Sequence, residues 1–144
     1  MKVALFDIDG TIADCTHRQH HLTGPGKKDW GAFYAGMSDD VPNEPVVALL
    51  RAVAAVYPIV LCTGRPSNYR DEIERWLGKY EIPYHALYCR HEGDFRDDTI
   101  IKREMLQTLR VLFEPVFSVD DRAKVVAMWR EEGITCFQCA PGEF

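Results

Sequence analysis

Two aspartates stand two positions apart, directly after a short apolar run. The run covers residues 3–6, and the chain continues as Asp7-Ile8-Asp9-Gly10-Thr11. Carboxylates held this close repel each other and resist burial unless something compensates their charge. The spacing is therefore typical of a site that binds a cation. The rest of the sequence must indicate which reaction that cation would assist.

Polar side chains also follow two later apolar runs. A Thr-Gly-Arg segment (63–65) comes after residues 59–62, and an Asp-Asp-Arg segment (120–122) comes after residues 116–119. Ligands of open parallel sheets bind outside the carboxyl ends of the strands. We therefore expect two acidic pairs and one hydroxyl to share one edge. The alternative is that these acids only cap helices and turns. Capping would readily explain one acidic pair at a strand end, but it is a poorer explanation for two.

This set of oxygen ligands favours Mg²⁺ over zinc, which prefers histidine and thiolate. A magnesium ion beside a free aspartate suits a dianionic phosphate ester, because the cation neutralises the phosphate while the aspartate can attack phosphorus. Gly10 allows a tight turn after the strand, and neighbouring N–H groups can face phosphate oxygens. Lys102, early in a helical pattern, is the lysine that we expect to complete the charge balance.

The elements that must position these residues alternate along the chain. Apolar segments predict strands at 3–6, 59–62, 85–89, 116–119 and 135–139, and amphipathic segments predict helices at 44–57, 69–79, 98–110 and 123–132. This order predicts an α/β fold: a three-layer, Rossmann-like parallel sheet of about five strands with helices on both faces. In the first long helix we expect Val46, Leu49, Leu50 and Val53 on the apolar face, with Asn43 as N-cap.

One long segment breaks the alternation. Residues 15–42 are polar, glycine-rich and aromatic, and they separate the first strand from the first long helix. A segment this long is usually a lid or binding loop, although an ordinary surface excursion is the alternative. We expect a single domain over residues 1–144 with residues 15–42 as a small cap insert, called the lid below.

The lid carries two further patterns. Its aromatic and basic residues could stack a nucleobase and steady a phosphate, or form a small amphipathic helix that packs its rings on the sheet: Lys27, Lys28, Trp30, Phe33 and Tyr34. Both interpretations stay open. His17, His20 and His21 could form a metal cluster, but adjacent histidines cannot share one helical face, which favours solvent-exposed or substrate-contacting roles.

Composition and cysteine usage limit the class of protein. With 144 residues and a formal net charge of −5, the chain is not built to coat nucleic acid, although a basic spot could hold one strand end. An odd count of five cysteines favours free thiols in a reducing compartment, and a metal role for the Cys136-x-x-Cys139 pair is disfavoured. Without an apolar run near 20 residues or room for a signal peptide before the first strand, we expect a cytoplasmic protein.

The polar segments also resemble a known family. Asp7-x-Asp9-Gly10-Thr11, Thr63, Lys102 and Asp120-Asp121 are similar, in order, to the four motifs of the haloacid dehalogenase (HAD) phosphohydrolase superfamily. A closer resemblance, to the 3′-phosphatase domain of phage-type polynucleotide kinase/phosphatases, runs through most of the chain. It is carried by LFDIDGTIAD, Pro42-Asn43, TGR, IPYHALYCRHEGDFRDDTIIKRE and SVDDRAKVVAMWREEGITCFQCAPGEF.

The resemblance implies a two-step mechanism. Asp7 would be the nucleophile that forms an aspartyl-phosphate, and Asp9 would act as general acid and then as general base. Magnesium would be held by Asp7, the backbone carbonyl of Asp9, and the pair Asp120-Asp121. Thr63 and Lys102 would bind the phosphate, and supporting substrate-binding positions would be Thr11, Gly64, Arg65, Arg90, Asp98 and Arg122. Asp98 precedes Lys102 by one helical turn and could orient it.

Two departures from the phage-type pattern bear on function. The chain contains no G-x-x-x-x-G-K-[ST] segment for a kinase, and its lid differs in length and content.

We expect a Mg²⁺-dependent phosphomonoesterase that removes a 3′-phosphate from nucleic-acid ends or nucleotides. The alternatives are a small-molecule HAD phosphatase, such as a nucleotidase or sugar-phosphate phosphatase, and a non-catalytic binder of phosphorylated ends, which the retention of Asp7, Asp9 and Lys102 disfavours. A kinase or ligase partner acting in trans, and a monomeric or dimeric state, stay open.

Overall fold

A five-stranded parallel sheet forms the centre of the protein, as expected from the alternating pattern. The computed structural model describes residues 1–143, and the strand order is β5-β4-β1-β6-β7. The strands are β1 (Lys2–Phe6), β4 (Ile59–Pro66), β5 (Ala86–Arg90), β6 (Glu114–Asp120) and β7 (Cys136–Gln138). β1 pairs with β4 on one side and with β6 on the other. The three strands that end at the predicted acidic pairs and at the Thr-Gly-Arg segment are therefore direct neighbours.

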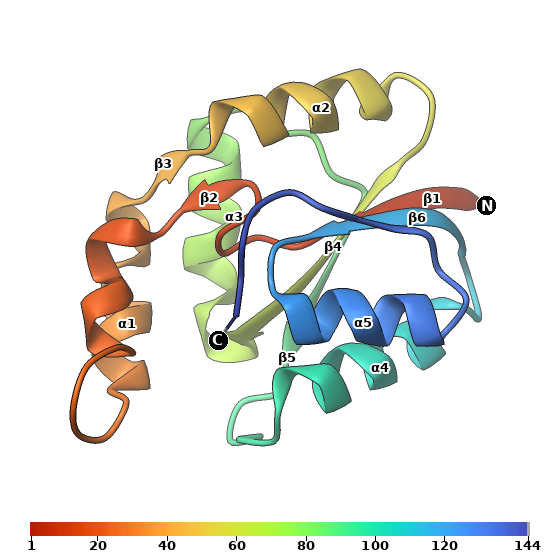
Figure 1. Ribbon diagram of the computed structural model, residues 1–144. Coiled ribbons are helices and arrows are strands. Elements are labelled where there is room, and N and C mark those ends of the chain that lie inside the picture. Colours follow the sequence, from red (N-terminus) through yellow and green to blue (C-terminus); the bar gives the residue numbers. More distant parts are fainter. Residues whose placement is uncertain (144) are drawn as a thin grey trace.

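Helices cover both faces of the sheet and complete three layers (Figure 1). Alternate residues of β1 point to opposite faces: Ala4 and Phe6 belong to the core under α2 and α3, whereas Val3 and Leu5 belong to the core under α4 and α5. The helices are α2 (Glu44–Ala54), α3 (Arg70–Lys79), α4 (Asp98–Leu109) and α5 (Ala123–Glu131), with a short 3₁₀ helix η3 (Ser67–Tyr69) before α3.

The lid folds into small elements of its own between β1 and α2. They are β2 (Ala13–Asp14), η1 (Thr16–His21), α1 (Trp30–Ala35), η2 (Met37–Asp39) and β3 (Val41–Pro42), where η1 and η2 are 3₁₀ helices. β2 and β3 pair antiparallel and close the base of the lid. Figure 1 shows α1 beyond the end of β1 opposite to the N-terminus, so the lid stands over the carboxyl ends of the strands.

Several local predictions were wrong in detail. Leu49 is 43% exposed, and Val47 is buried in its place, because the face of α2 that packs on the core is rotated from the predicted one. The predicted N-cap position of Asn43 in α2 is confirmed, although its side-chain amide donates to the carbonyl of Thr11 at 2.9 Å and makes no capping bond. Cys139 lies beyond β7, not within it.

Within residues 1–143, no helix has the length and apolar character needed to cross a membrane.

Candidate active site

The predicted acidic residues converge at the carboxyl edge of the sheet. Asp7 follows β1, Asp120 ends β6, and one carboxylate oxygen from each of Asp7, Asp120 and Asp121 lies within 4.8 Å of the others. All three residues are buried. Gly10 permits this close approach, because its φ is +77° and a Cβ at that position would overlap the Asp121 carboxylate.

Lys102 lies among these carboxylates. Its Nζ donates to Asp7 Oδ1 at 2.8 Å and to Asp120 Oδ2 at 2.9 Å, and it lies 3.8 Å from Asp98 Oδ2, one turn earlier on α4. Burial would lower the pKa of Lys102, but the charges of Asp120 and Asp7 outweigh burial and raise this pKa well above its usual value. The lysine is therefore a fixed cation at neutral pH.

One lysine does not balance the acidic cluster. Burial and the charge of Asp120 raise the pKa of Asp7 well above its usual value, although Lys102 opposes the shift. Burial and Asp120 also raise the pKa of Asp121 to about 6. Besides burial, the negative charge of Asp120 contributes to both shifts, and the donor set consists of three buried carboxylates. Such a set fits a hard divalent cation such as Mg²⁺, which prefers oxygen ligands.

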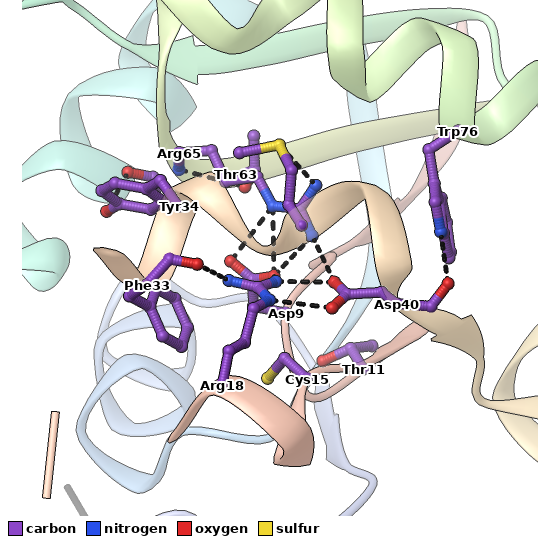
Figure 2. Close-up of polar contacts among 12 residues, drawn as sticks. Asp9, Thr11, Cys15, Arg18, Phe33, Tyr34, Asp40, Thr63, Arg65 and Trp76 are labelled. Carbon is purple, nitrogen blue, oxygen red and sulfur yellow. Dashed lines mark hydrogen bonds and ion pairs between the residues drawn. The ribbon is translucent and has the colours of Figure 1, made fainter. Parts of the chain in front are cut away.

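Asp9 faces a different cluster, which the lid completes (Figure 2). Arg65 from β4 and Arg18 from η1 each donate to Asp9 Oδ1 at 2.6 Å. Burial alone would raise the pKa of Asp9, but the charges of Arg65 and Arg18 outweigh it and lower the pKa to about 2. Asp9 is thus an ionised carboxylate at neutral pH, and its pKa is shifted in the opposite direction from that of Asp7.

Asp40 is the second acid of this cluster and comes from the end of the lid. Its Oδ1 accepts from Arg18 Nε at 2.8 Å, and its Oδ2 accepts from Arg18 Nη2 at 2.6 Å and Arg65 Nη2 at 3.1 Å. His17 Nε2 lies 2.7 Å from Asp40 Oδ1, and the Arg18 guanidinium lies 4.2 Å from the ring centroid of Phe33. Two arginines and two aspartates therefore balance one another and tie the lid to the sheet edge.

The Gly64 carbonyl joins the lid to the opposite wall of the site. It accepts from Arg90 Nε at 2.8 Å and from the Tyr34 hydroxyl at 3.3 Å. Arg90 Nη2 and Arg122 Nη1 lie 3.5 Å and 3.7 Å from carboxylate oxygens of Asp98. Three of the predicted supporting residues, Arg90, Asp98 and Arg122, are therefore brought together near Lys102.

The two threonines hold the turns after β1 and within β4. Thr11 Oγ1 donates to Asp7 Oδ2 at 3.0 Å. Thr63 is buried, and its Oγ1 accepts from the backbone N–H of Arg65 at 3.1 Å. The hydroxyl of Thr63 thus supports the turn that aims Arg65 at Asp9.

A cavity of about 870 Å³, including its open mouth, lies between the acids and the lid. Asp7, Asp9, Asp120 and Asp121 form part of its lining, and the lid contributes Leu22, Trp30, Phe33 and Tyr34 among others. One end of the cavity is acidic and the lid side is largely apolar.

The aromatic part of the lid forms a small helix, α1, which was one of the two interpretations left open by the sequence. Asp29 caps α1 by accepting from Ala32 N at 3.0 Å, and Phe33 is buried. Tyr34 packs against Tyr69 with ring centroids 5.4 Å apart, whereas Trp30 stays 40% exposed at the cavity. The three lid histidines do not belong to the metal-type cluster found within residues 1–143.

Sequence reasoning missed Arg18 and Asp40. Arg18 is the one arginine of the lid, and it is 1% exposed, as is Asp40. The available signal was that Arg18 is a lone arginine among the polar residues of the lid. No spacing rule connects an insert residue to a strand end, so the pairing itself could not be read from the pattern.

Comparison with known proteins agrees with this geometry. Residues 1–144 match the family described as the polynucleotide kinase PNKP phosphatase domain. Chains in two solved structures, of a Pnkp1/Rnl/Hen1 complex and of a Pnkp1/Rnl/Hen1 RNA repair complex, are 34% identical, with TM-scores of 0.86 and 0.82. The matches cover 99% of this chain and 47% and 43% of those chains, so this chain spans less than half their length.

A more distant structure shares the fold alone. The haloacid dehalogenase-like hydrolase SP0104 from Streptococcus pneumoniae is 16% identical with a TM-score of 0.66, and the match covers 95% of this chain and 84% of that one. Together with the full-length family match, the architecture and the acidic edge identify the enzyme class. The chain is a phosphatase of the HAD superfamily and belongs to the polynucleotide kinase PNKP phosphatase-domain family.

Proposed function

We propose that this phosphatase removes the 3′-phosphate from nucleic-acid ends through an aspartyl-phosphate on Asp7, with Mg²⁺ as cofactor. The observation that carries the proposal is the contrast between Asp7 and Asp9 at one cavity: Asp7 lies among acids and Lys102, and Asp9 lies between two arginines. Two carboxyl groups in environments this different can take different roles in one reaction. Membership in the polynucleotide kinase phosphatase family supports a nucleic-acid end as substrate.

Asp7, Asp120 and Asp121, with the backbone carbonyl of Asp9, would hold Mg²⁺. When bound, the ion neutralises the acidic cluster and the incoming phosphate, so that a carboxylate nucleophile and a dianion can approach each other. Lys102 already contacts Asp7 and is placed to neutralise phosphate oxygens as well. Thr11 orients the other Asp7 oxygen through its hydroxyl.

In the first step, Asp7 forms a bond to phosphorus while the bond from phosphorus to the 3′-oxygen breaks, and Asp9 gives the leaving oxygen a proton. In the second step, Asp9 takes a proton from water as the water oxygen attacks phosphorus, which releases phosphate and restores the Asp7 carboxylate. Arg65 and Arg18 hold the Asp9 carboxylate in place between the two steps.

The relatives also suggest a setting for this chemistry. The 34% identical chains were solved in complexes with Rnl and Hen1. We infer that this chain, too, works beside a ligase or another end-processing enzyme supplied in trans.

The test is phosphate release with Mg²⁺ from matched substrates: a 3′-phosphorylated oligonucleotide, the same oligonucleotide phosphorylated at its 5′ end, mononucleotides, and sugar phosphates. We expect a strong preference for the 3′-phosphate. The Asp7→Asn variant should have no measurable turnover and an unchanged circular dichroism spectrum. Preference for sugar phosphates would instead assign the alternative small-molecule phosphatase, and full activity of Asp7→Asn would remove the nucleophile assignment.

A further inference from the structure

A second groove opens beside the active-site cavity. The two share six lining residues, including Lys28, Trp30, Tyr34 and Arg122, so they are continuous. A substrate whose phosphate reaches the acids through the first cavity could therefore extend into the second. We call this second space the side groove and define it by the residues that carry the argument: Lys28, Trp30, Phe95, Arg96, Arg122 and Lys124.

The side groove is positively charged on an acidic protein. Its lining contains five lysine or arginine side chains and three aspartates, whereas the whole chain has a formal net charge of −5. Lys124 pairs with Asp97 at 2.6 Å, yet its side chain keeps 41% exposure. Local positive charge beside a phosphatase site complements a second phosphate group better than it complements a neutral ligand.

Phe95 gives the side groove an aromatic surface. The residue is 94% exposed, the most exposed of the large apolar side chains among residues 1–143, so it contributes nothing to the core. A single exposed apolar side chain needs no explanation in general. Here, however, the ring stands in the same groove as Trp30, which is 40% exposed and has Lys28 Nζ 5.7 Å from its ring centroid.

The loop that carries Phe95 is held firmly to the active site. Arg90 Nη1 donates to the carbonyls of Asp94 and Arg96, on either side of Phe95, at 3.1 Å and 2.6 Å. The same arginine donates through Nε to the Gly64 carbonyl. Arg96 is braced in turn by Glu104 at 2.7 Å. The backbone around Phe95 is thus pre-organised relative to the catalytic edge, which lowers the entropy cost of binding.

We propose that the side groove binds the nucleotide that precedes the 3′-terminal nucleotide of a single strand. Its base stacks on Phe95, and the phosphodiester that follows lies near Lys124 and Lys28. A single strand is favoured over a duplex because stacking on a side chain needs an unstacked base, and the acidic chain is poorly suited to hold a second strand. This inference rests on the proposed function, since it assumes a nucleic-acid 3′ end at the acids.

The first test compares thymidine 3′-monophosphate with single-stranded 3′-phosphorylated DNA of two to five nucleotides. We expect kcat/KM to rise from one to two nucleotides and to change little with further length. Phe95→Ala should raise KM for the dinucleotide about 5- to 150-fold, the range for loss of one stacked base, with kcat unchanged and the mononucleotide unaffected. Lys124→Ala should raise KM several-fold and weaken its dependence on salt. Leu112→Ala and Lys79→Ala, both exposed and outside the groove, are the matched controls.

A binding measurement separates this inference from the proposed function. The Asp7→Asn protein, with and without Phe95→Ala, is titrated with a fluorescent 3′-phosphorylated tetranucleotide and followed by anisotropy. Weaker binding with Phe95→Ala supports the side groove even if the wild type releases no phosphate, in which case the proposed function fails alone. Equal binding by both proteins, or equal effects of Phe95→Ala on mononucleotide and dinucleotide turnover, overturns the side groove and leaves the phosphatase assignment standing.

Discussion

At the scale of single residues, the surroundings of Asp7 and Asp9 shift the pKa values of two aspartates in opposite directions. Asp7 lies beside Asp120 and has a raised pKa, whereas Asp9 lies between Arg65 and Arg18 and has a pKa of about 2. In the proposed mechanism, an ionised Asp9 is able to accept a proton from water in the second step. To donate in the first step it must gain a proton, which an arriving phosphate dianion favours by repelling the carboxylate and attracting the arginines.

The role proposed for Asp9 predicts a kinetic signature. With p-nitrophenyl phosphate, whose leaving group needs no proton, Asp9→Asn should release about one equivalent of p-nitrophenolate in a burst. Steady turnover should then be slower than wild type by roughly 10²- to 10⁴-fold, the usual value of a general acid–base group. Stopped-flow absorbance measures both phases. A steady rate equal to that of the wild type, with no burst, contradicts the assignment.

At the scale of elements, the lid does more than cover the cavity, because it supplies half of the charge network around Asp9. Arg18 comes from η1 and Asp40 follows η2, while Asp9 and Arg65 come from the sheet edge. Trp76 from α3 also donates to the Asp40 carbonyl at 2.9 Å. Lid docking and the ionisation state of Asp9 are therefore coupled through the same side chains.

This coupling predicts how much stability the protein loses when the positive charge of Arg18 is removed. Arg18→Gln leaves Asp40 buried with fewer partners and should lower the free energy of unfolding by about 3 kcal/mol, as for other broken buried ion pairs. Urea denaturation followed by circular dichroism measures the change. The exposed Arg75→Gln should change stability by less than about 0.5 kcal/mol.

A double variant separates charge from packing in the same network. Arg18→Gln/Asp40→Asn should recover part of the stability lost in Arg18→Gln, since Asp40 no longer carries a charge without its main partner. If the double variant is instead less stable by the sum of both single effects, the network contributes through packing and not through charge balance.

At the scale of the whole molecule, the acidic cluster should link stability to pH and to the proposed cofactor, magnesium. The pKa of Asp121 rises from 3.8 to about 6 in the folded protein, and the pKa of Asp7 also rises. A carboxyl group with a raised folded pKa favours the folded state only while it is protonated. The stability of the metal-free protein should therefore fall between about pH 4 and pH 6, by about 3 kcal/mol for Asp121 alone. The lowered pKa of Asp9 acts below this range and does not offset the loss.

Magnesium should reverse that loss, since it binds the ionised cluster and not the protonated one. We expect Mg²⁺ to raise the midpoint of thermal unfolding clearly at pH 7.5 and little at pH 4.5. Differential scanning calorimetry at matched ionic strength, with EDTA as the metal-free reference, measures both. Asp121→Asn should reduce the pH dependence and the magnesium effect together. An equal magnesium effect at both pH values argues against a carboxylate site.

Much of this arrangement follows from local sequence. Apolar runs of four or five residues predict the strands, and a polar residue directly after such a run lies toward the carboxyl end of its strand. The sequence by itself therefore determined that Asp7, Thr63 and Asp120 share one edge of the sheet. The turn spacing of Asp98 and Lys102 is likewise a local property of a helix. These predictions succeed because strand and helix periods act over a few residues.

Tertiary structure alone decided how the lid meets that edge. Arg18 and Asp40 have no periodic relation to Asp9, and the side groove unites lid residues with Phe95 and Lys124 from distant parts of the chain. The burial of Val47 in place of Leu49 has the same origin, because the rotation of α2 is set by its packing on the core that it shares with β4 and α3. Contacts between segments far apart in sequence depend on how whole elements pack, and no short spacing records that packing.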